Sequence, residues 1–208
     1  MSQHEVDGIA SNGRVRVGEQ RPGGRAARVR SDVLAATATL LNTVGYEQLS
    51  IEDVADEAGV HKTTVYRRWS SKAELVADAV RRNAEQAVPM PDTGSLLGDL
   101  QVLGRNVVAN IGSEGGSLRS RSIVAASTGS DELMAELHSF WAERLATSEV
   151  IVDRAIERGE LPDGTDANLV IEAVVGPIWL RLLLTGEPID ADFADRIADL
   201  VAAGATVR

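Results

Sequence analysis

The chain has 208 residues, a formal net charge of −10 and no cysteine. The lack of cysteine excludes disulfides and thiolate metal sites and favours an intracellular, cytoplasmic protein. No stretch approaches the roughly 20 apolar residues that a membrane-spanning helix needs, so we expect no membrane partner. Aromatic residues make up only 3% of the chain, which predicts an aliphatic, alanine-rich core and helices rather than sheets.

The negative charge is unevenly distributed. Residues 1–82 carry twelve Arg or Lys against eleven Asp or Glu, whereas residues 83–208 carry nine against twenty. A cationic end on an acidic body orients the molecule toward the phosphates of nucleic acid. The alternative is that the acidic surface simply keeps the protein in solution.

Residues 1–27 are polar, rich in glycine and arginine, and show no apolar periodicity. We therefore expect a disordered basic arm, which is either a solvated tail or a contact to the DNA backbone or minor groove. The first helix is expected to begin near residues 25–31 and to end before Gly45, with Val33 and Leu34 on its inner face.

Residues 50–75 predict two short helices joined by a sharp turn. The first begins at Ser50, where Asp53 three positions later completes an N-terminal cap. Apolar residues then recur at helical spacing up to Ala58. Gly59 suits the left-handed conformation that lets a chain leave a helix abruptly.

The second of these helices opens at His61 or Lys62. It turns Val65 and Trp69, four positions apart, toward the first helix and leaves a polar, cationic outer face. Two helices that cross steeply over a short turn form a helix-turn-helix, whose second helix enters the DNA major groove.

This segment resembles the TetR (tetracycline repressor-like) family of transcriptional regulators over roughly residues 28–80. The matching residues are Gly45-Tyr46, Ile51-x-x-Val54-Ala55-x-x-Ala58-Gly59-Val60, Thr63-Thr64-Val65-Tyr66-Arg67-Arg68-Trp69 and Ser71-Lys72. Two residues depart from the family pattern, since His61 replaces a small hydroxyl cap and Trp69 replaces a phenylalanine.

The resemblance implies a homodimeric, ligand-responsive regulator, with a repressor as the favoured sense, that a small effector releases from a palindromic operator. It also implies that Tyr66 and Lys72 contact the backbone of double-stranded DNA. A phenol and an ammonium group both suit a phosphate. The alternative places Tyr66 in the small core and leaves Lys72 solvated.

Base contacts are expected from the front and outer face of the second helix, namely from Lys62, Thr63, Thr64 and Arg67. Lysine and arginine donate to guanine, and a threonine methyl group meets the thymine methyl. Arg68 is either a further phosphate contact or a surface residue. Trp69 is expected in the core because it shares the buried face with Val65.

Ser71 and Glu74 predict a cap for a linking helix that runs to about Gln86, and Pro89 and Pro91 mark a boundary. We therefore divide the chain into three parts. These are the arm over 1–27, the helix-turn-helix domain with its linking helix over 28–88, and an effector-binding and dimerisation domain over 92–208.

The C-terminal part predicts helices only, which makes the chain all-α with about nine helices. Its helices are expected over residues 96–111, 118–126, 130–158, 166–185 and 190–203, with a break over 112–116. Gly176-Pro177 is expected to interrupt the helix over 166–185, because a proline removes a backbone hydrogen bond. The resemblance implies that the last two helices pair with their copies in a four-helix dimer interface.

Large apolar residues in this part are candidates for an effector pocket, because a bundle of long helices can leave a ligand cavity. The candidates are Leu103, Val107, Trp141, Ile178, Trp179 and Leu182. They predict a small, mainly apolar effector. The alternative for each of them is an ordinary place in the core.

Catalysis finds little support in the sequence. The histidines His4, His61 and His138 form no metal-binding pair, and no phosphate-binding or nucleophile motif is present. We therefore expect no enzyme, no cofactor and no metal site. The remaining rival is a helical scaffold protein whose three-helix unit does not bind DNA.

Overall fold

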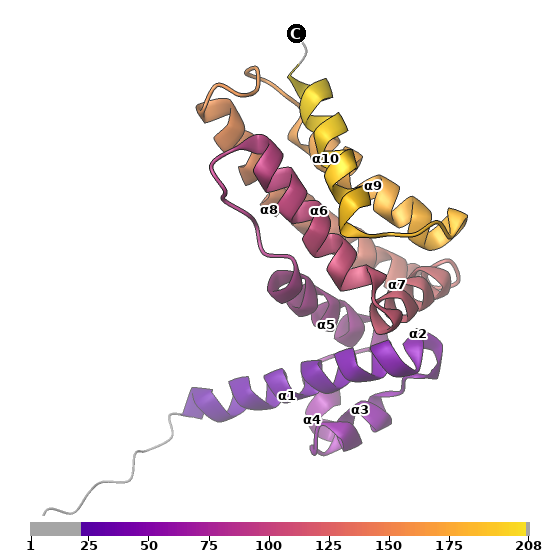
Figure 1. Cartoon of the computed structure of the whole chain (residues 1–208). Coiled ribbons are helices and arrows are strands. Elements are labelled where there is room, and N and C mark those ends of the chain that lie inside the picture. The colour runs from indigo at the N-terminus through magenta and orange to yellow at the C-terminus, as the bar shows by residue number, and fades with distance from the viewer. Residues whose placement is uncertain (1–21, 207–208) are drawn as a thin grey trace, which may run out of the picture.

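The computed structural model describes residues 22–206, and all regular structure within them is helical (Figure 1). The head consists of α1 (Pro22–Thr43), α2 (Gly45–Gln48), α3 (Ile51–Glu57) and α4 (Lys62–Tyr66), and α5 (Lys72–Ala87) leads from it to the body. The body consists of α6 (Leu96–Gly112), α7 (Glu114–Ser127), α8 (Asp131–Glu157), α9 (Ala167–Leu180), the π-helical turn η1 (Arg181–Thr185) and α10 (Ala191–Ala205). The prediction of an all-α chain is confirmed.

The head begins earlier than its sequence suggests. The predicted arm lies largely outside the described residues, but residues 22–27 belong to α1, so the expected start of the first helix near residues 25–31 is wrong. A proline is tolerated in the first turn of a helix, where its missing N–H has no partner to lose. The two alanines that follow, Ala26 and Ala27, are strong helix formers.

The core of the head is built from α1, α3, α4 and α5. Trp69 is only 3% exposed and belongs to this core, as predicted. Its Nε1 donates to Asp78 Oδ2 at 3.0 Å, and Asp78 also pairs with Arg30 of α1. The core continues into the body, because Ile123 of α7 and Leu133 of α8 pack in the same cluster. The head is therefore packed against the body as well as joined to it by α5.

Side-chain caps fix the starts of the helices. Ser50 accepts a hydrogen bond from the backbone N–H of Asp53, and Ser71 from that of Glu74, as predicted. Ser130 caps α8 in the same way, by accepting from the N–H of Leu133. The further caps are Ser95, Ser113, Asp166 and Asp190. Each cap satisfies one of the backbone donors that a helix start leaves free.

Two predicted interruptions of the body helices are wrong. The break expected over residues 112–116 is a single residue, Ser113, which ends α6 and caps α7. The helix α9 also continues through Gly176-Pro177 to Leu180 and then widens into η1. The described residues form ten α-helices, one more than expected. The additional one is the four-residue α2.

The segment Ala167–Thr185 corrects the expectation about membrane spans. The segment has nineteen residues, and an 18-residue window of it has a mean hydropathy of 1.7, so it is long and apolar enough to cross a membrane by length and composition. In the fold, Val170, Val174 and Ile178 face the core of the body, where α6, α8 and α10 pack against α9. The apolar character of this segment is therefore partly that of a core helix.

Candidate DNA-binding surface and effector pocket

The turn between α3 and α4 holds the second helix in place. Gly59 adopts φ +64°, the left-handed conformation expected of it. The N–H of Val60 then donates to Ala55 O at 2.9 Å, which ties the turn back to α3. Val65 is fully buried, so the opposite face of α4 is held outward.

His61 takes the role of the hydroxyl cap that it replaces. Its Nδ1 lies 3.3 Å from the backbone nitrogen of Thr63 and accepts its hydrogen bond, and lies 2.9 Å from Thr63 Oγ1. This contact needs the imidazole with Nδ1 unprotonated. The departure from the family pattern at this position is thus accommodated by equivalent capping.

We expect His61→Ala to destabilise the protein by about 0.5–2 kcal/mol, the usual loss for an N-cap. His61→Ser should retain most of the stability, because a serine hydroxyl can accept the same bond. The midpoints of urea unfolding of the two variants and the parent measure the effect. Equal losses in both variants would show that the cap is not what stabilises α4.

The outer face of α4 is exposed and cationic. Lys62, Thr63, Arg67 and Arg68 are exposed and Thr64 is half-buried. Only one of these cations has a carboxylate partner among the described residues: Lys62 Nζ lies 3.5 Å from Glu52 Oε1, and both side chains are exposed. Exposed pairs of this kind contribute little, so Lys62 is readily available to another anion.

Tyr66 does not lie in the core and Lys72 is not fully solvated, which were the alternatives to their contact with DNA. Tyr66 is 48% exposed and does not lie in the core. Lys72 is half-buried at the start of α5, with Nζ 4.3 Å from the centroid of the Tyr46 ring and 3.3 Å from Glu47 O. Burial lowers the pKa of Lys72, while the charge of Glu47 opposes this shift. Lys72 is thus held in position rather than freely solvated.

A basic hollow of about 640 Å³ lies between the start of α1 and the end of α4. Arg25, Arg30, Arg67 and Arg68 line it, together with Thr64 and Trp69. The guanidinium of Arg68 reaches Ala26 O at 3.5 Å. Arg25 and Arg30 belong to the run of arginines before residue 31, for which a contact to the DNA backbone or minor groove was one of the two alternatives. Their place beside Arg67 and Arg68 could not be predicted, because it depends on how α1 packs on α4.

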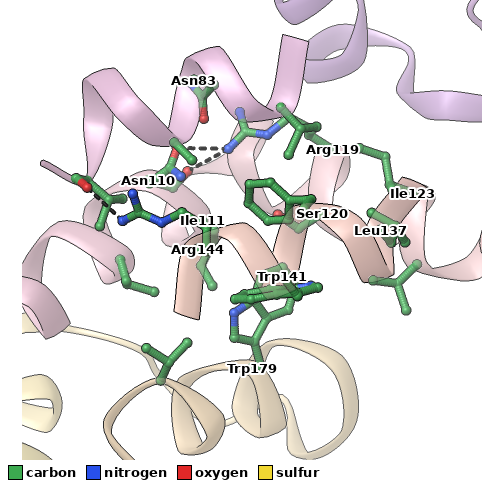
Figure 2. Close-up of a pocket in the computed structure, with 17 residues that line it drawn as sticks. Asn83, Asn110, Ile111, Arg119, Ser120, Ile123, Leu137, Trp141, Arg144 and Trp179 are labelled. Carbon is green, nitrogen blue, oxygen red and sulfur yellow. Dashed lines mark hydrogen bonds between the residues drawn. The ribbon is translucent and has the colours of Figure 1, made fainter. Parts of the chain in front are cut away.

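The body contains two adjoining pockets, of about 100 and about 300 Å³. Figure 2 shows the first of them. They share the side chains of Trp141, Arg144, Val175 and Trp179. The rings of Trp141 and Trp179 pack edge to face, with centroids 5.5 Å apart and an interplanar angle of 78°. Most of the other lining side chains are apolar, in agreement with the predicted kind of site.

The predicted pocket residues separate into two groups. Val107 lines the first pocket, Leu103 the second, and the two tryptophans line both. Ile178 and Leu182 line neither pocket and are buried in the core, which is the alternative place considered for them. On α9 the positions that face the pockets are those of Val175 and Trp179, and Ile178 points elsewhere because each helical residue turns by about 100°.

Sequence reasoning missed two arginines that line the first pocket. Arg119 is only 6% exposed, and burial lowers the pKa of its guanidinium. Arg144 is half-buried and donates to Val88 O at 2.8 Å. Burial likewise lowers the pKa of Arg144, against the opposing effect of Glu85. The pocket is therefore apolar with two cationic groups in its wall.

Two hydrogen bonds join α7, which forms part of the wall of the first pocket, to the head. Arg119 Nη1 donates to Asn42 Oδ1 of α1 at 2.6 Å. Three residues further along α7, Ser122 Oγ accepts from the backbone N–H of Tyr46 in α2 at 2.9 Å. A ligand that moved α7 would consequently act on the end of α1 and on α2.

Known families and proteins match both parts of the chain. Residues 33–79 match the bacterial regulatory proteins of the tetR family, and residues 90–201 match the tetracyclin repressor-like C-terminal domain. The HTH-type transcriptional regulator AqdR of Rhodococcus erythropolis is 32% identical over 185 residues, which cover 89% of each chain. YdeS of Bacillus subtilis, an HTH-type transcriptional regulator, is 30% identical over 81% of this chain and 84% of its own.

The fold agrees with these matches. The crystal structure of the TetR family transcription regulator SCO0332 superposes with a TM-score of 0.75 at 29% identity, over 85% of this chain and 98% of that one. The helix-turn-helix geometry, the exposed cationic face of α4 and the pocketed helical body are the parts of one architecture. The chain belongs to the TetR family of helix-turn-helix transcriptional regulators.

Proposed function

We propose that this regulator is a repressor that binds a palindromic operator as a homodimer and leaves it when a small, mainly apolar effector enters the body. The observation that carries the proposal is the exposed cationic face of α4, held outward by the buried Val65. A scaffold protein without DNA binding would have no use for such a face on a helix-turn-helix. We place the protein in the cytoplasm, where it has access to DNA.

We further propose a division of contacts on this face. Lys62, Thr63, Thr64 and Arg67 read bases, because they lie at the front and on the outer side of α4. Tyr66, Arg68 and Lys72 contact phosphates. The hollow lined by Arg25 and Arg30 extends the cationic surface along α1. With α4 in the major groove, the DNA backbone at the edge of that groove would lie against this hollow.

The proposed function is tested by selecting bound duplexes from a random pool and from genomic fragments. We expect a palindrome whose half-sites are spaced for two α4 helices on one face of the DNA. Arg67→Ala should lose base preference at one position of each half-site, by about 1–3 kcal/mol. Lys72→Ala should weaken binding to all sequences alike. It should also lower the slope of log affinity against log salt concentration by about one.

A matched control for these variants is Arg121→Ala, which removes an exposed arginine of α7 in the body. Its operator affinity should equal that of the parent. A protein that enriches no sequence at low salt, with or without candidate effectors, would overturn the proposed function.

The dimer interface is proposed on α9, η1 and α10. Four of the large apolar side chains of this region are exposed in the single chain, namely Leu169, Leu180, Leu184 and Leu200. Apolar side chains gathered on one region of a soluble protein mark an interaction surface. A second copy that presents the same helices would cover them in a four-helix arrangement with two-fold symmetry.

We propose that the chain divides functionally at Pro89–Pro91, with DNA binding before it and effector binding and dimerisation over residues 92–208. The two parts communicate through α5 and through the bonds of α7 to the head, Arg119 to Asn42 and Ser122 to Tyr46. A coupling of roughly 1–3 kcal/mol between effector and operator would change occupancy about 5- to 150-fold.

A further inference from the structure

Arg119 brings a full positive charge into the interior of the body. It is 6% exposed, and a buried ion is costly unless an opposite charge lies nearby. The ion pairs of the described residues include neither Arg119 nor Arg144. The charge of Arg119 is therefore uncompensated at a pocket wall.

The hydrogen bonds of Arg119 position its guanidinium without neutralising it. Nη1 donates to Asn42 Oδ1 at 2.6 Å. Nη2 donates to Asn110 O at 3.1 Å and to Asn110 Oδ1 at 2.9 Å (Figure 2). All three acceptors are neutral amide oxygens. An arginine has five N–H groups, so two of them remain for another acceptor.

One further polar group of the pocket wall lacks a partner within residues 22–206. The Nε1 of Trp179 is buried and donates to no acceptor. Arg144 uses one N–H group, in its bond to Val88 O. Unsatisfied buried donors are rare in folded proteins. The pocket therefore offers polar donors to a ligand as well as apolar surface.

The polar and apolar parts of the pocket are separated in space. Figure 2 shows Arg119, Asn110 and Asn83 on one side and the edge-to-face pair of Trp141 and Trp179 on the other. The tryptophan side adjoins the second pocket, which Arg144 and Glu172 line together with apolar residues. Arg119 thus lies at one end of the site, the tryptophans lie at the other, and Arg144 is shared by both pockets.

We propose that the effector of this regulator is an amphipathic carboxylic acid whose carboxylate pairs with Arg119, assisted by Arg144, while its apolar body lies against Trp141 and Trp179. The inference rests on the proposed function, since it names the chemical class that the effector pocket takes. A carboxylate supplies the missing opposite charge and accepts from the free N–H groups of a guanidinium. A neutral apolar molecule of the same shape would leave Arg119 uncompensated.

The test compares acids with alcohols of the same skeleton, titrated into the full-length protein by calorimetry. The probes are octanoate with octanol, decanoate with decanol, and 4-phenylbutyrate with 4-phenylbutanol, all below the concentrations at which they form micelles. We expect at least one acid to bind about tenfold or more tightly than its alcohol, the gain expected of a charge-assisted hydrogen bond.

Variants assign the preference to the two arginines. In Arg119→Gln and in Arg144→Gln the ratio of acid to alcohol affinity should fall toward one, whereas the alcohol should bind as it does to the parent. Arg119→Lys keeps the charge and should keep part of the ratio. The matched control is Arg121→Gln on the same helix, whose side chain is exposed and lines neither pocket. Because the acid and its alcohol are titrated into the same variant, the ratio of their affinities is informative even where that variant is less stable.

Three results would overturn the proposal: alcohols that bind as tightly as the acids, an acid preference that survives in both glutamine variants, or no acid of the panel bound at millimolar concentration. Operator selection is measured separately on the same protein. If an operator is found and no acid binds, the regulator function stands and the acid proposal fails. If no sequence is selected, the proposed function fails whatever the acids do.

Discussion

Replacing both Leu184 and Leu200 by glutamate is expected to convert the proposed dimer into monomers and to lower operator affinity by about a hundredfold or more. Leu184 is 78% exposed and Leu200 is 74% exposed in the single chain, so neither change disturbs the core of the body. In the dimer both side chains would be covered, and a buried unpaired carboxylate is strongly unfavourable. A monomer also loses the gain of about 10²–10⁴ that two linked heads obtain on a palindrome.

Light scattering at micromolar concentration reports the mass, and a salt-matched titration of the selected operator reports the affinity. The control is Leu97→Glu, which places the same charge on an exposed apolar position of α6, outside the proposed interface. It should leave mass and affinity unchanged. A double variant that keeps the dimeric mass would show that α9, η1 and α10 do not form the interface.

The starts of α3 and α5 could be predicted from the sequence because their causes are local. A serine caps the N–H group three residues later, and the predicted bonds of Ser50 and Ser71 are both formed. The exposed face of α4 could be anticipated for the same reason. The alternation of buried Val65 with exposed Tyr66 and Arg67 follows from helical geometry.

Whether Pro177 interrupts α9 could not be predicted from the neighbouring residues alone. A proline removes one backbone donor, and its cost depends on what the rest of the helix gains. Val174 and Ile178, on either side of Pro177, are fully buried in the core of the body. Their burial stabilises α9 on both sides of the proline, and the irregularity appears only at η1, after Leu180.

The cationic end of the pocket could not be predicted because it joins segments far apart in the chain. Arg119 meets Asn42 across 77 residues, and Arg144 meets Val88 across 56. The two arginines of α7 illustrate the difficulty. Arg119 is buried and Arg121 is exposed, yet the many serines, glycines and alanines of α7 leave no clear apolar stripe to distinguish them.

Gly45→Ala is expected to destabilise the protein by about 2–4 kcal/mol, because Gly45 lies where the head is packed on the body. Its φ of +76° is a conformation that other residues adopt at a cost of about 1–3 kcal/mol. An added Cβ would also lie 3.1 Å from both Cβ and Oγ of Ser122. Ser122 cannot withdraw freely, because its Oγ accepts the N–H of Tyr46 at 2.9 Å.

Gly59→Ala separates the cost of a positive φ from the cost of the contact with Ser122. Gly59 has a similar φ of +64°, but an added Cβ there would meet nothing within 4 Å, so its variant should show only the backbone cost of about 1–2 kcal/mol. Urea unfolding of both variants, and of Gly45→Ala combined with Ser122→Gly, completes the comparison. Ser122→Gly alone is the reference, because it also removes the bond to Tyr46. Relative to that variant, the added loss from Gly45→Ala should be smaller than in the parent by the part that the contact causes. Equal losses for Gly45→Ala and Gly59→Ala would show that the close packing of α2 on α7 adds nothing to stability, and that the head is held to the body by α1 and α5 alone.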